Sequence, residues 1–303
     1  MEKLLGLSFP LEADYYSEDL VKFGHLDDLF SSYHWPCLRI LRVRGVHCSP
    51  ATAVAFLAAH PTIEELRTDK MFGADGIKIL REGTRMVDPP VLAPDTLPNL
   101  RVLGCDISRT ISILSTPSSI PRPIEYINDI DMRDPVRRDR FLELLASTPS
   151  LRRLDLEWSA GPEDAIRLSQ VAKSLSWLEN GSNNTGRGIT DKEVVRCFNV
   201  WWVLWRTDMF IFVLQTRWIN AIAHFPELTA FHNVPLLFEN DIDGCARTVT
   251  TLSKMCPKLR RIDAWDQSAS YGSGSKQKWF AALLCEAGQP GWRILPQDDW
   301  GGF

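Results

Sequence analysis

Few residues in this chain have types and spacings that could do chemistry. The segment 272–276, Gly-Ser-Gly-Ser-Lys, resembles a phosphate-binding loop in composition but lacks the spacing of a Walker motif. It opens the amphipathic stretch 276–287, so we expect a loop that starts a helix there. The Gly-x-Ser-x-Gly motif of α/β-hydrolases and the His-Glu-x-x-His motif of zinc proteases do not occur. The sequence therefore predicts no catalytic, cofactor-binding or metal-binding residues.

The histidines and cysteines suggest packing more than catalysis. The six histidines are scattered, and His60 and His224 lie next to or near prolines that end predicted helices. The seven cysteines, at 37, 48, 105, 197, 245, 256 and 285, form no Cys-x-x-Cys pair, and several occupy positions that need an apolar residue. We interpret them as reduced thiols in a core.

A short phrase recurs along the chain, a proline, any residue, then Leu-x-x-Leu or a close variant. Clear copies begin at Pro36, Pro61, Pro98, Pro149, Pro226 and Pro257, and weaker ones at Arg122 and Lys173. Most copies follow one another at about 24 to 32 residues, close to the period of leucine-rich repeats.

Within each unit the apolar spacing changes from that of a strand to that of a helix. In the first full unit, Leu38, Leu41 and Val43 form the inward set of a strand, and Ser49-Pro50 is the start signal of a helix over 51–60. Further helices are predicted over 138–147, 162–174 and 246–256. The fold class expected is α/β, a right-handed leucine-rich-repeat horseshoe that forms a single domain over residues 1–303.

Two units, LPNLRVLGCDIS (97–108) and TPSLRRLDLEWS (148–159), are similar to the irregular repeats of the fungal F-box/leucine-rich-repeat families. The resemblance implies the substrate-recognition part of an SCF-type ubiquitin ligase receptor. In that family a three-helix F-box precedes the repeats and docks on a Skp1-type adaptor. No F-box is found in this sequence, so adaptor binding is expected only if an F-box lies upstream.

The first residues resemble the strand of an earlier unit, with Leu4, Leu5, Leu7 and Phe9 at strand spacing and a helix opening near Ser17. An exposed first strand is an aggregation hazard. We therefore expect upstream sequence or a covering protein. The alternative is that residues 1–16 form a cap.

Two repeat steps are long. The first contains a loop insertion over 70–96, with paired prolines, which is either a binding element or a solvated insertion. The second contains an aromatic stretch over 195–215 that interrupts the helix pattern joining Val194 to Trp218. We interpret it as a retained intron; a genuine surface insertion is the alternative.

Composition limits partners and location. The net charge is −4, which argues against nucleic acid as the main partner. The start of the chain lacks the apolar region of a signal peptide, so a cytoplasmic or nuclear location is expected. A membrane helix over the aromatic stretch is disfavoured because Arg196, Arg206 and Asp208 would be costly in a bilayer. No cofactor is expected.

The repeat register predicts which side chains line the concave face of the strands. They are Arg42, Arg44, Arg67, Asp69, Asp106, Asn128, Asp155, Glu157, Glu179, His232, Asp263 and Trp265. Their charge changes from basic in the first units to acidic in the later ones, which would orient an elongated partner. Trp158 and Trp265 are candidate aromatic anchors. The alternative is an ordinary solvated strand surface.

The function expected is non-catalytic binding of a protein partner on this face. One alternative is a regulator of an enzyme, such as a GTPase-activating repeat protein that supplies Arg42 or Arg44 in trans. Another is a degenerate paralogue without a stable function.

Overall fold

The computed structural model describes most of the repeats of the chain. The described residues are 4–10, 26–44, 47–69, 72–73, 89–156, 161–180, 216–232, 242–263, 279–286 and 289–296. They belong to two compact units, Met1–Leu154 and Asp155–Phe303, which we describe one at a time. The expected single domain over 1–303 stays a prediction.

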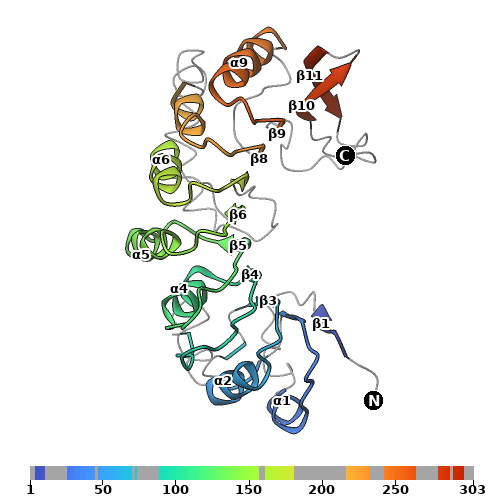
Figure 1. Ribbon diagram of the computed structural model, residues 1–303, viewed down its shortest axis with the longest axis vertical. Helices are drawn as coiled ribbons and strands as arrows, with labels where there is room; N and C mark the ends of the chain where they lie inside the picture. Colours follow the sequence, from blue (N-terminus) through green and yellow to red (C-terminus); the bar gives the residue numbers. More distant parts are fainter. Residues whose placement is uncertain are drawn as a thin grey trace, which may run out of the picture. The chain divides into compact units, whose positions relative to one another are not determined.

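The first unit alternates strands and helices along the sequence (Figure 1). Its elements are β1 (Gly6–Pro10), α1 (Asp27–Ser32), β2 (Ile40–Arg44), α2 (Pro50–Ala59), β3 (Glu65–Thr68), β4 (Val102–Gly104), α4 (Ile107–Ser115), β5 (Tyr126–Ile130) and α5 (Pro135–Leu145). The strand β6 (Arg153–Leu156) begins in this unit and ends in the second. This order confirms the predicted alternation of strand and helix.

The strands of the first unit pair in parallel with their sequence neighbours, from β1 to β5. A parallel neighbour needs a crossover connection, and the helices supply it on one face of the sheet (Figure 1). The register aligns Leu41 with Leu66, Leu66 with Leu103, and Leu103 with Ile127. The repeated leucine of the sequence is therefore one row of side chains running across the sheet.

This row is the centre of the core of the first unit. The aligned leucines at 41, 66 and 103 and Ile127 are at most 1% exposed, as are Leu38, Ile63, Leu100 and Ile124, which open each repeat phrase. Burying a leucine side chain stabilises a fold by about 1.5–3 kcal/mol. Since each strand contributes only a few such side chains, the sheet depends on neighbouring repeats to complete its core.

Local signals in the sequence set the helix starts. Ser49 accepts a hydrogen bond from the backbone N–H of Thr52 at the start of α2, and Pro50 follows in the first turn. Asp134 accepts from the N–H groups of Val136 and Arg137 at the start of α5. The helices predicted near 51–60 and 138–147 are confirmed, with bounds that differ by a few residues.

The polar position of the repeat phrase ties each repeat to the one before it. Thr62 Oγ1 donates to the carbonyl of Leu38 at 2.8 Å, and Ser150 Oγ donates to the carbonyl of Ile124 at 2.9 Å. Asn99 Nδ2 donates in the same way to the carbonyl of Pro61 at 3.0 Å. These bonds satisfy carbonyl groups just before the strands, where the ladder has not yet begun.

The second unit continues the alternation with α6 (Pro162–Val171), β7 (Trp177–Glu179), a helix over 216–222, β8 (Ala230–His232), α9 (Ile242–Met255) and β9 (Arg261–Asp263). The strands β7, β8 and β9 pair in parallel. The helices predicted over 162–174 and 246–256 are confirmed as α6 and α9.

The end of the described chain corrects one prediction. The stretch 276–287 was expected to form a helix, but it contains β10 (Trp279–Glu286), which pairs antiparallel with β9 and with β11 (Gln289–Pro296). Its apolar residues also fit a strand. Short apolar runs do not distinguish strand from helix by spacing alone.

Several sequence predictions fall outside the described residues. These are the aromatic stretch 195–215, most of the loop insertion 70–96 and the helix start near Ser17. The helix over 216–222 buries Trp218 and Ile222, two members of the predicted stripe, and leaves Ile219 half-buried. The retained-intron interpretation stays a hypothesis. In the parts of the chain that the structure describes, no helix is long and apolar enough to cross a membrane.

Candidate protein-binding surface

Each core leucine of a strand is flanked by two residues that point to the opposite face of the sheet, because side chains alternate along a strand. In β3, Leu66 and Thr68 are buried and Glu65 and Arg67 are partly exposed. We call the described residues of this opposite face in the first unit the strand face. They are Ile40, Arg42, Glu65, Arg67, Val102, Gly104, Tyr126, Asn128 and Arg153.

Two arginines of the strand face share one carboxylate. Arg42 donates through Nε and Nη2 to the two carboxylate oxygens of Glu65, at 2.7 and 3.1 Å, and Arg67 Nε donates to Glu65 Oε1 at 2.6 Å. Burial alone would raise the pKa of Glu65, but the hydrogen bonds and charges of both arginines outweigh it and lower this pKa. The hydrogen bond to Glu65 also raises the pKa of Arg42. This trio therefore keeps a net positive charge.

An aromatic ring extends the trio toward β6. The guanidinium carbon of Arg67 lies 5.5 Å from the centre of the Tyr126 ring, and that of Arg153 lies 4.5 Å from it. Both distances are within the range of cation–π attraction. Tyr126 of β5 thus contacts one arginine from β3 and one from β6 on the strand face.

A glycine lets side chains from two neighbouring strands meet. Gly104 pairs with Arg67 on one side and Asn128 on the other. A Cβ at this glycine would collide with Asn128 Oδ1 and would lie 2.9 Å from Arg67 Cγ. Asn128 is only 6% exposed, and its Nδ2 donates to Asp129 Oδ2 at 3.2 Å, while its Oδ1 has no hydrogen-bond partner among the described residues.

A second row of charges borders the strand face at the beginning of each strand. Along this row the signs alternate from repeat to repeat, in the order Arg39, Glu64, Arg101, Glu125 and Arg152. Arg101 bridges both carboxylate oxygens of Glu125 at 2.7 and 2.9 Å, and Arg39 lies 3.4 Å from Glu64. Exposed pairs of this kind contribute about 0.2–1 kcal/mol each.

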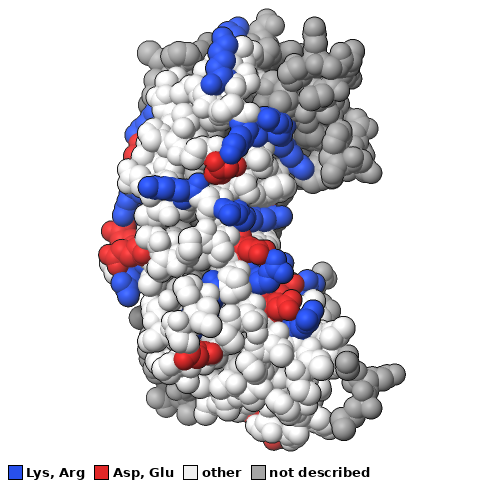
Figure 2. All heavy atoms as spheres, in the orientation of Figure 1, with Lys and Arg blue, Asp and Glu red and all other residues white. Residues whose placement is uncertain are grey.

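The first unit thus has a basic surface in a chain of net charge −4. The strand face contains three arginines and one glutamate, and the bordering row adds three arginines and two glutamates. Figure 2 shows Lys and Arg atoms next to fewer acidic atoms over the strands of this unit. Such a surface attracts acidic groups and repels basic ones.

In the second unit, the same face is more aromatic and more buried. The rings of Trp177 and His232, on β7 and β8, stack with their centres 4.2 Å apart. Arg261 of β9 lies with its guanidinium carbon 5.8 Å from the centre of the Trp177 ring. His232 is 2% exposed, so its ring offers little surface to a partner.

The structure places the thirteen predicted partner-binding residues unevenly. Arg42, Arg67 and Asn128 lie together on the strand face, and Asp155 and Glu179 are half-buried in the second unit. Five others have side chains or whole residues outside the described part of the chain: Arg44, Glu157, Trp158, Asp263 and Trp265. Their role in binding stays a prediction.

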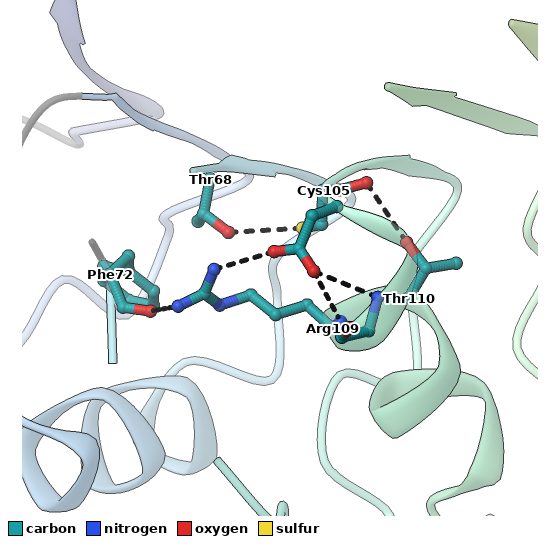
Figure 3. Close-up of polar contacts among 7 residues, drawn as sticks. Thr68, Phe72, Cys105, Arg109 and Thr110 are labelled. Atoms are coloured by element: carbon teal, nitrogen blue, oxygen red, sulfur yellow. Dashed lines mark hydrogen bonds and ion pairs between the residues drawn. The ribbon is translucent and has the colours of Figure 1, made fainter. Parts of the chain in front are cut away.

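Asp69 lies just after β3, and Asp106 lies just after β4. Asp106 Oδ1 accepts from the backbone N–H groups of Ser108 and Arg109 and so caps α4, while its Oδ2 pairs with Arg109 Nη1 at 2.9 Å (Figure 3). Arg109 Nη2 in turn donates to the carbonyl of Phe72 at 2.6 Å. This buried contact fixes the start of the loop insertion next to α4, which gives Asp106 a structural task. Asp69 is half-buried, and its N–H donates to the carbonyl of Val43 at 3.3 Å.

Sequence reasoning missed Glu65, Tyr126 and Arg153. The prediction considered residues that follow the core leucine of each strand, whereas these three precede it. Strand alternation places both neighbours of the leucine on one face, so the period of two would have found them.

The described residues contain no group of three His, Cys, Asp or Glu side chains that could hold a metal ion. Comparison of the chain with known protein families finds no family that matches, and comparison with curated proteins finds no match either. The residues of the strand face are therefore the main structural indication of function.

Proposed function

We propose that this chain is a leucine-rich-repeat module that binds a protein partner on the strand face of its first unit and performs no chemistry itself. The observation that carries the proposal is the contrast within each strand. The leucines at 41, 66 and 103 are at most 1% exposed, while Arg42, Glu65 and Arg67 beside them present charge on the other face. Arginine and aromatic side chains are enriched at protein interfaces.

The resemblance to F-box/leucine-rich-repeat proteins adds a specific role to this proposal. The partner would be a substrate recruited for ubiquitination, and a Skp1-type adaptor would associate only through an F-box upstream of these repeats. The strand face would supply recognition alone.

The proposal is tested by purifying the tagged chain from its host cells and quantifying bound proteins by mass spectrometry. The test variant is Arg42→Glu with Arg67→Glu, and the matched control is Arg137→Glu with Arg140→Glu on α5, which changes the charge equally. The control arginines are 45% and 53% exposed and pair only with residues of their own helix region. We expect at least one partner to be lost with the test variant and kept with the control. Equal partner sets for wild type and both variants would contradict binding on the strand face.

The recruitment role has its own readout. Deleting the gene should raise the level of that partner, and restoring the wild-type chain, but not the strand-face variant, should lower it again. A partner whose level and ubiquitination do not change would leave the binding proposal standing and refute the ligase role.

A further inference from the structure

We propose that the strand face of the first unit recognises an acidic peptide segment. The carboxylates of the segment would bind Arg42 and Arg67, and one of its backbone N–H groups would donate to Asn128 Oδ1. This inference rests on the proposed function and specifies the chemistry of the partner.

The two arginines keep hydrogen-bonding capacity for a ligand. Arg67 contacts Glu65 through Nε alone, so Nη1 and Nη2 of Arg67 make no hydrogen bond to the described residues. Nη1 of Arg42 likewise makes no hydrogen bond to the described residues. The side chain of Arg67 is 27% exposed and that of Arg42 is 49% exposed, whereas that of Glu65 is 13% exposed. Glu65 therefore lies below the two guanidinium groups and orders them, and the remaining donors can contact a carboxylate from outside.

Asn128 supplies an acceptor beside these donors. Its Oδ1 is buried, lacks a hydrogen-bond partner in the described part of the chain and lies over Gly104, next to the aliphatic part of Arg67. A buried carbonyl oxygen without a partner is unfavourable, so a ligand that donates an N–H to it gains affinity. The row Arg67, Gly104 and Asn128 thus combines donors and an acceptor across three neighbouring strands.

The combination of groups favours a peptide over a nucleic acid. A nucleic acid offers acceptors to arginines through its phosphates, but its N–H donors are on the bases and not on the backbone that the arginines would hold. An acidic peptide offers both, since every non-proline residue has a backbone N–H and each Asp or Glu has a carboxylate.

The test uses fluorescein-labelled hexaglutamate as the probe and the full chain as the receptor, with binding measured by fluorescence anisotropy at low ionic strength. We expect hexaglutamate to bind and hexaglutamine to bind at least about tenfold more weakly. Arg42→Gln with Arg67→Gln should weaken hexaglutamate binding by at least about tenfold, while Arg137→Gln with Arg140→Gln should change it by less than about twofold. Equal binding of the two peptides, or equal loss with both variant pairs, would overturn the proposal.

Two further measurements separate recognition from general charge attraction. Glu65→Gln should tighten hexaglutamate binding, because the amide oxygen can still accept hydrogen bonds from the arginines while the competing negative charge is removed. Unchanged or weaker binding by a variant that keeps the wild-type melting temperature would count against the proposal. Hexaglutamate with N-methylated backbone amides should bind wild type about fivefold more weakly than unmodified hexaglutamate does. The Asn128→Leu variant should bind the two peptides with equal affinity. Equal affinity of the methylated and unmethylated peptides for wild type would refute the role of Asn128.

Two results distinguish failure of the acidic-peptide proposal from failure of protein binding. If an oligouridylate RNA binds the strand face more tightly than hexaglutamate does, the acidic-peptide proposal fails in favour of nucleic acid. If cellular partners depend on Arg42 and Arg67 while hexaglutamate does not bind, protein binding stands and only the acidic chemistry is wrong.

Discussion

At the scale of single residues, Glu65 decides the character of the strand face. It lies between two arginines, and their hydrogen bonds lower its pKa despite burial, so it stays ionised. One carboxylate for two guanidinium groups leaves a positive charge and fixes both arginines in place. The side chain of Arg42 is therefore fixed by two hydrogen bonds to Glu65. A fixed arginine suits a binding surface, whereas a catalytic arginine supplied in trans must extend into another protein.

His60 should make the stability of the first unit depend on pH. Its ring is buried, Nδ1 donates to the carbonyl of Phe56 at 2.7 Å and Nε2 accepts from the backbone N–H of Trp35 at 2.9 Å. Burial lowers the pKa of His60, and the neighbouring His34 lowers it further. The folded state therefore prefers the neutral ring, and protonation would place an N–H against the N–H of Trp35.

Because the pKa of His60 is lower in the folded than in the unfolded chain, the unfolded state binds more protons as the pH falls. We expect the free energy of unfolding to be highest above the ordinary histidine pKa of 6.5 and to decrease as the pH drops through the lowered folded-state value. Urea unfolding across this range measures the effect. In His60→Gln the decrease should be smaller than in wild type, and a decrease of the same size would show that another group causes it.

At the scale of elements, the packing of Arg67 from β3 and Asn128 from β5 over β4 depends on the missing side chain at Gly104. We expect Gly104→Ala to destabilise the chain by about 1–3 kcal/mol, because the added Cβ would press on the buried Asn128 and on the stem of Arg67. The matched control is Gly6→Ala in β1, where the added Cβ would meet Ile40 Cβ at an ordinary 3.6 Å. Thermal unfolding of both variants measures the difference, and equal melting temperatures would contradict the account of this contact.

Side-chain caps explain where the helices start. Ser49, Asp106 and Asp134 each accept hydrogen bonds from the first turn of the helix that follows, and the segments after them are long enough to bury one apolar side. These bonds form within a few residues, so the sequence predicted α2 and α5 well. The hairpin of β10 and β11 depends on pairing with β9, and its short apolar run gave no such local signal.

At the scale of the whole molecule, the buried thiols should report global unfolding. Burial raises the pKa of Cys48 to about 12 and the pKa values of Cys105 and Cys256 to about 11. The reactive thiolate is therefore scarce in the folded chain at ordinary pH. We expect iodoacetamide to modify these three cysteines at pH 8 only after urea unfolds the protein, as measured by peptide mass spectrometry. Rapid modification of Cys105 in the native chain would contradict the packing of β3 against β4.

The repeating alternation of strand and helix can be predicted from the amino-acid sequence alone. The proline and leucine phrase fixed where each strand starts, and the caps fixed where helices start, because both signals act over a few neighbouring residues. The sequence also placed Arg42, Arg67 and Asn128 on one face, since side-chain alternation is a property of any strand.

How those side chains contact one another could not be predicted without the folded structure. That Arg42 and Arg67 share Glu65, that Tyr126 lies against two arginines and that Asn128 lies over Gly104 are contacts between residues at least 20 positions apart in sequence, apart from the pair Arg67 and Glu65. Such contacts depend on the register between strands, and register is set by packing across the whole sheet. For the same reason the sequence could not foresee that His232 would be buried against Trp177 rather than exposed to a partner.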